Sequence, residues 1–125
     1  MVYILHIVEK QRPDNILQIL GVFDEENQAK DILLRYSEEN DIKVGAELII
    51  KEYQCEKSDK YYVHHTFMNS MGYYDFNILN IYPDLLLVPK HRKRSKFTSF
   101  RACGFKANEI YNEKKSGKLW MENYV

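Results

Sequence analysis

Residues 90–106 carry the densest positive charge in the chain, and we call them the basic segment. They carry seven basic side chains and no acidic one. Consecutive basic residues cannot all point one way, so they need water or a long anionic surface, and a phosphate backbone is such a surface. The segment therefore predicts contact with nucleic acid. The predicted contact residues are Lys90, Arg92, Lys93, Arg94, Lys96, Arg101 and Lys106.

Phenylalanines at positions 97, 100 and 105 are interleaved with these cations. Basic and aromatic side chains together can hold a phosphate backbone and stack on exposed bases, although phenylalanines also form cores. The same composition suits a nuclear localisation signal or an acidic protein partner. A further interpretation is charge compensation within the fold or a dimer. Residues 1–60 carry 8 basic and 13 acidic side chains, whereas residues 61–125 carry 10 basic and 5 acidic ones.

The four histidines and two cysteines raise the question of a metal site. His64 and His65 are adjacent, and adjacent residues of a strand point to opposite faces, so the two cannot readily serve one ion. No Cys-x-x-Cys or His-x-x-x-His pattern is present. The chain also has no Walker loop and no glycine-rich dinucleotide loop. We therefore expect neither a metal nor a cofactor.

Nucleophilic catalysis would require a cysteine beside a histidine. Cys55 or Cys103 with His64 or His65 is formally such a pair, and both cysteines are expected to be free thiols. No flanking residues specify a nucleophile turn or an oxyanion hole. We therefore predict no catalytic residue, and a small Cys/His hydrolase is the least favoured of three functions.

Tyrosines cluster in the middle of the chain. Tyr61, Tyr62, Tyr73 and Tyr74 are candidate interface residues because tyrosine is enriched at binding hot spots, although sheet packing explains such a cluster as well. The first predicted function is a non-enzymatic protein that binds nucleic acid. The alternative is a protein–protein interaction module, a structural component or an inhibitor, that uses the aromatic strands and an acidic helix.

The first half of the chain predicts a β-β-α-β order. Residues 2–8 and 16–23 are apolar and rich in β-formers, and the polar turn between them favours an antiparallel hairpin. Asp24 is expected to cap a helix over residues 25–38, whose apolar residues recur at helical spacing. Residues 46–53 predict the third strand.

The second half predicts a β-rich region that carries the basic segment. The expected elements are strands over 61–67 and 73–82, a short buried strand over 85–88, and a short C-terminal helix over 107–115. Together the two halves, 1–56 and 61–125, predict a single α+β domain over residues 1–125 with a mainly antiparallel sheet.

A short motif supports the first half of this prediction. Tyr3-Ile4-Leu5-His6, then Gly21-Val22-Phe23, then a helix with Ala29 resemble the start of a family of small bacterial domains. Members begin with Tyr-x-Leu-His, continue with Gly-Val-Phe or Gly-Val-Tyr, and lead into an acidic helix and a strand. The match covers residues 3–53. The resemblance implies a β-β-α-β core and implies no chemistry.

The N-terminus shows no basic region followed by a long apolar run, so no signal peptide is predicted. The longest apolar runs span a few residues, far below the roughly 20 that cross a bilayer. We therefore expect a cytoplasmic or nuclear location and no membrane partner. The expected partners are nucleic acid or an acidic protein, and the sequence leaves a homo-oligomer open.

Overall fold

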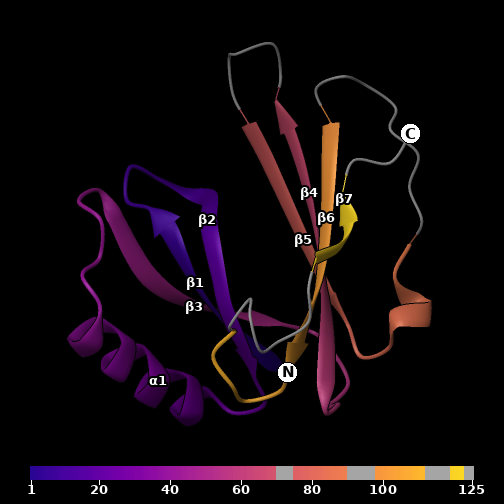
Figure 1. Ribbon diagram of the computed structural model, residues 1–125, viewed down its shortest axis with the longest axis horizontal. Helices are drawn as coiled ribbons and strands as arrows, with labels where there is room; N and C mark the ends of the chain where they lie inside the picture. The colour runs from indigo at the N-terminus through magenta and orange to yellow at the C-terminus, as the bar shows by residue number, and fades with distance from the viewer. Residues whose placement is uncertain (70–74, 90–97, 112–118, 123–125) are drawn as a thin grey trace.

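Three antiparallel strands form a first sheet in the order β2-β1-β3 (Figure 1). The structure is a computed structural model that describes residues 1–69, 75–89, 98–111 and 119–122. The strands of the first sheet are β1 (Val2–Glu9), β2 (Arg12–Phe23) and β3 (Ala46–Tyr53). Local apolar runs specify these strands, and the predicted hairpin and third strand are confirmed.

Helix α1 (Glu26–Glu39) covers one face of the first sheet. Ala29 is fully buried there against Leu5 and Phe23, as its helical spacing predicted. The helix is confirmed, but its predicted cap is wrong. The residue before the helix is Glu25, whose side chain makes no capping hydrogen bond. The Asp24 carboxylate instead accepts hydrogen bonds from Tyr61 and Asn108, residues far away in the sequence.

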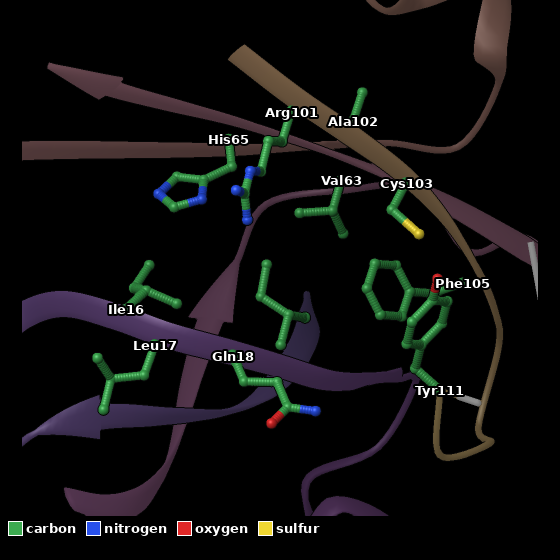
Figure 2. A pocket seen from close by; sticks show the side chains of 11 residues that line it. Ile16, Leu17, Gln18, Val63, His65, Arg101, Ala102, Cys103, Phe105 and Tyr111 are labelled. Carbon is green, nitrogen blue, oxygen red and sulfur yellow. The ribbon is translucent and has the colours of Figure 1, made fainter. Parts of the chain in front are cut away.

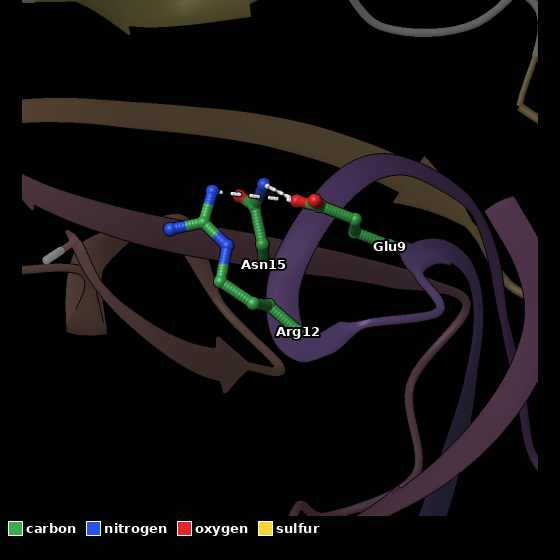
Figure 3. A network of polar contacts seen from close by, with 3 residues as sticks. All are labelled: Glu9, Arg12 and Asn15. Atoms are coloured by element: carbon green, nitrogen blue, oxygen red, sulfur yellow. Dashed lines mark hydrogen bonds and ion pairs between the residues drawn. The ribbon is translucent and has the colours of Figure 1, made fainter. Parts of the chain in front are cut away.

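Strand β2 begins four residues earlier than predicted, so the turn consists only of residues 10 and 11. Side chains hold its start in place. The Asn15 amide donates to the Glu9 carboxylate over 2.8 Å, and the Arg12 guanidinium lies 3.4 Å from the same oxygen (Figure 3). Pro13 is tolerated in this strand because β2 lies at the edge of its sheet.

Four strands form the second sheet, in the order β5-β4-β6-β7, with antiparallel neighbours throughout. They are β4 (Lys60–Asn69), β5 (Asp75–Tyr82), β6 (Thr98–Lys106) and β7 (Leu119–Glu122). The predicted strands over 61–67 and 73–82 correspond to β4 and β5. The last nine residues of the basic segment form β6, which the sequence did not predict as a strand.

The predicted buried strand over 85–88 is wrong. Leu85–Leu87 form a single turn of 3-10 helix, η1, and all three leucine side chains are exposed. Asp84 caps this turn by accepting a hydrogen bond from the Leu86 amide over 3.0 Å. Prolines at positions 83 and 89 flank the turn and limit strand pairing on both sides.

The two sheets pack face to face and enclose the larger core (Figure 1). Their buried side chains interdigitate between β1 and β2 on one side and β4, β5 and β6 on the other. These core residues are Val2, Ile4, Val22, Tyr61, Val63, Leu79, Ile81 and Phe105. The result is three layers, α1, the first sheet and the second sheet, which confirms an α+β architecture.

Residues 107–111 return from β6 to the free edge of β2. The Asn108 amide donates to the Val22 carbonyl over 2.9 Å, and the Tyr111 amide donates to the Leu20 carbonyl over 2.6 Å. Asn108 adopts a left-handed conformation with φ of 65°, which excludes a regular helix at this position. The predicted C-terminal helix is therefore not formed over 107–111, and residues 112–115 lie outside the described residues.

Candidate ligand pocket between the two sheets

A pocket of about 350 Å³ opens between β2 of the first sheet and strands β4 and β6 of the second (Figure 2). Its size lies within the range of about 300–1,000 Å³ that is typical of small-ligand sites. Tyr111, from the segment that returns to β2, completes one side. Figure 2 shows Arg101, Val63 and Cys103 extending from the second sheet toward β2, with His65 beside Arg101.

Side chains alternate between the two faces of β4 and of β6, and this alternation determines which of them line the pocket. Residues two apart on a strand share a face, so Val63 and His65 lie on one face of β4. The register places Arg101 opposite His65 and Cys103 opposite Val63. The same face ends in the buried Phe105. The wall is therefore basic at the His65–Arg101 end, where Arg101 is exposed and His65 is half-buried, and apolar at the Phe105 end.

Irregular pairing shapes the opposite wall. Four consecutive residues of β2, Ile16 to Ile19, line the pocket. The pairing of β1 with β2 shifts in register twice near this stretch, and Leu17 is one of the residues skipped. Such bulges twist a strand locally and change the direction of its side chains.

The structure brings Cys103 and His65 to one wall of the pocket. They are diagonal neighbours on β4 and β6. The Cys103 thiol lies 3.7 Å from the Gly104 carbonyl oxygen. Burial, and next the charge of Glu56, raise the pKa of Cys55, which disfavours its nucleophilic thiolate. Cys55 is therefore a poor candidate for the nucleophile of a Cys/His hydrolase.

The predicted nucleic-acid-binding residues fall into three groups. Arg101 is exposed at the pocket. Lys106 is exposed too, but it lies on the opposite face of β6 and its Nζ is 2.9 Å from a Glu109 carboxylate oxygen. Phe105 is buried and contacts Tyr111 with ring centroids 4.8 Å apart, so it belongs to the core. The remaining predicted residues, Lys90, Arg92, Lys93, Arg94 and Lys96, lie outside the described residues.

The candidate interface tyrosines do not form one exposed group among the described residues. Tyr61 is fully buried and its hydroxyl donates to Asp24, so its side chain is inaccessible to a partner. Tyr62 is half-buried beside Val88, and the Lys60 ammonium lies 5.6 Å from its ring centroid. Tyr73 and Tyr74 lie outside the described residues. The aromatic strands therefore present no group of exposed tyrosines over the part of the chain that can be described.

Sequence reasoning did not identify the contributions of β2 and Tyr111 to the pocket. The stretch Ile16–Leu20 carries one polar residue among four apolar ones, which indicates a strand but not a pocket wall. Tyr111 was assigned to a predicted helix. No local sequence signal marks either contribution, because both depend on pairing between distant segments.

Within the described residues, no group of three or more His, Cys, Asp and Glu side chains is placed to hold a metal ion. No helix in the same residues is long and apolar enough to cross a membrane.

No protein-family model matches the chain, and comparisons with curated proteins and with solved structures find no match either. The resemblance of residues 3–53 to small bacterial domains therefore stays a prediction.

Proposed function

We propose that this protein is a non-enzymatic binding protein that contacts single-stranded nucleic acid through the basic segment and the pocket side of β6. One observation carries the proposal. The run of cations from Lys90 to Lys96 leads, without an acidic residue, directly into β6, where Arg101 is exposed at the mouth of the pocket. A chain of cations continuous with a basic pocket suits a flexible polyanion.

The spacing along the chain fits several consecutive phosphates. Lys96 lies five residues before Arg101, so the two Cα atoms are at most about 18 Å apart. Phosphates of one strand in a duplex are about 3.4 Å apart along the helix axis, and those of an unstacked strand lie farther apart, so this length corresponds to at most about five nucleotides. A single strand is favoured over a duplex because its unpaired bases can enter a pocket between two sheets, whereas stacked base pairs cannot.

Replacing Arg92, Lys93 and Arg94 together by alanine should remove most of the affinity for a single-stranded oligonucleotide. Each phosphate contact on a single strand contributes about 0.7 to the slope of log affinity against log salt concentration, so three lost contacts should reduce the slope by about 2. Fluorescence anisotropy at several salt concentrations measures both quantities.

The matched control replaces three cations of the first half, Lys10, Arg35 and Lys43, all of which are exposed. Both triple variants change the net charge equally. If the control loses as much affinity as the basic-segment variant, total charge rather than the basic segment governs binding. Wild-type binding that does not respond to salt would contradict the proposal.

A second candidate function, protein–protein interaction, is favoured by the η1 turn rather than by the tyrosines. Leu85, Leu86 and Leu87 are 44%, 90% and 57% exposed. Three consecutive exposed leucines are unusual unless they contact something. The turn is also held in place, because Val88 is buried behind it and the Ser58 hydroxyl donates to the Pro83 carbonyl over 3.1 Å. A preformed apolar turn suits an apolar groove on another protein.

Leu86→Ser should weaken binding of such a partner about tenfold or more if Leu86 is an anchor. Val44→Ser is the matched control, since Val44 is 98% exposed and lies in the loop before β3. Proteins recovered with each variant are compared, and a selected partner is then purified and titrated at high salt. Equal loss of affinity in the two variants, or binding abolished by salt, would contradict an apolar contact through η1.

A further inference from the structure

We propose that the pocket between the two sheets binds one nucleotide, with its phosphate at Arg101 and His65 and its base toward the aromatic wall of Phe105 and Tyr111. This inference deepens the proposed function and rests on it for the natural source of the nucleotide, a single strand held by the basic segment. The pocket has one basic end and one apolar end, and each end is suited to a different part of the ligand.

The basic end selects a phosphate. Arg101 and His65 are directly opposite in the β4–β6 register, and directly opposite residues have Cβ atoms about 4.5–5.5 Å apart. Both side chains can therefore reach one anion. The guanidinium presents planar N–H groups that match two phosphate oxygens. The imidazole adds a further N–H donor.

The apolar end suits a flat and weakly polar ring of the ligand. Val63 and the half-buried Ile19 both line the pocket. Phe105 with Tyr111 closes one side (Figure 2). The two rings are tilted by 48°, so they form an angled aromatic wall. Inorganic phosphate would leave these surfaces in contact with water. A ligand that joins a phosphate to an aromatic ring covers both ends, and a nucleotide is such a ligand.

The chain around the pocket favours a nucleotide of a strand over other aromatic phosphates. The sequence that leads into β6 is cationic as far as Lys96, five residues before Arg101, and such a stretch suits the further phosphates of a strand.

Adenosine 5′-monophosphate, adenosine and inorganic phosphate are suitable probes for titration calorimetry with the full chain. The monophosphate should bind about tenfold or more tightly than either of its parts. Arg101→Gln should reduce its affinity by about the same factor, while Arg35→Gln on α1 should not change it. Equal affinity for inorganic phosphate would overturn the inference, because it would indicate an anion site without recognition of the base.

Cys103 offers a test of the cavity itself. Cys103→Phe should fill the pocket and prevent binding of the monophosphate, whereas Cys103→Ser should preserve it. A measurement on the wild-type protein avoids any loss of folding in the variants: the monophosphate should slow alkylation of Cys103 and leave Cys55 unaffected. Both cysteines are half-buried free thiols, which makes Cys55 an internal control. Unchanged alkylation of Cys103 at saturating monophosphate would overturn the inference.

The two proposals fail in different ways. If the triple variant Arg92→Ala, Lys93→Ala, Arg94→Ala loses the oligonucleotide but keeps the monophosphate, both the strand contact and the pocket are supported. If Cys103→Phe binds the oligonucleotide as tightly as Cys103→Ser does, the basic segment acts alone and the pocket inference is overturned. If the wild-type chain binds the monophosphate but no oligonucleotide, the proposed function fails and the pocket remains a site for free nucleotides.

Discussion

Gly21→Ala should be among the most destabilising single substitutions in the chain, although it adds only one methyl group. A Cβ at Gly21 would lie 2.8 Å from the Glu109 carbonyl oxygen and 3.0 Å from the Phe23 ring. Glu109 belongs to the segment that returns from β6, so its backbone would have to move away from β2. That movement strains the hydrogen bonds from the Asn108 and Tyr111 amides to β2.

We expect a loss of about 2–4 kcal/mol in the free energy of unfolding, since overpacking and weakened hydrogen bonds act together. Urea denaturation monitored by circular dichroism measures this loss. The same variant should weaken nucleotide binding in the pocket, because Tyr111 is part of the displaced segment. Gly21 is therefore required for the close approach that completes one wall.

Gly45→Ala is the informative comparison. Gly45 has a φ of 86°, and no atom lies within 4 Å of the position of its added Cβ. Alanine there costs only the strain of the left-handed backbone, about 1–2 kcal/mol, and asparagine should cost less. If Gly21→Ala destabilises the protein less than Gly45→Ala does, the steric explanation at Gly21 is wrong.

The elements that the sequence predicted correctly are those with strong local patterns. Strand β3 matches its predicted bounds, and α1 is displaced by only one residue, because an apolar run and a helical stripe are patterns that can be recognised within a single segment. Leu85–Val88 is the informative failure. Its apolar run suggested a buried strand, but the Asp84 cap and the flanking prolines favour a turn that leaves the leucines exposed.

The candidate site was only partly predictable, for a related reason. Arg101, His65 and Cys103 were all identified from their chemistry, Arg101 as a nucleic-acid contact and the other two as members of a possible Cys/His pair. Their arrangement on one wall follows from the pairing of β4 with β6, and β6 was not predicted because its pattern is typical of a solvated basic stretch. Strand pairing depends on neighbours that are distant in sequence, so a strand of weak local preference becomes visible only in the folded chain.

Tyr61→Phe should lower the free energy of unfolding at neutral pH and change how this free energy depends on pH above 9. The Tyr61 hydroxyl donates to one Asp24 carboxylate oxygen and accepts a hydrogen bond from the Ser58 amide. Asn108 donates to the other Asp24 oxygen over 3.0 Å, so this cluster joins β4, the start of α1 and the segment after β6. Loss of a hydrogen bond to a charged group should cost about 1.5–3 kcal/mol below pH 10.

The alkaline response follows from the raised pKa of Tyr61. Burial, and then the hydrogen bond to Asp24, raise this pKa from 10.0 to about 12. Between these values the unfolded chain releases its proton while the folded chain retains it, so the unfolded state binds fewer protons and the free energy of unfolding falls as pH rises. The contribution is fully present below pH 10 and is lost by pH 12, and it amounts to at most about 3 kcal/mol.

Urea denaturation at several pH values between 9 and 12 should therefore give converging stabilities for the wild-type protein and Tyr61→Phe. Burial also raises the pKa of Tyr53, but this residue is present in both proteins and cancels in the difference. Tyr53→Phe is the matched control, because it removes a half-buried phenol whose pKa is also raised and which lies outside the Asp24 cluster. A constant stability difference between wild type and Tyr61→Phe across this range would show that the Tyr61 proton is not what couples the three segments to pH.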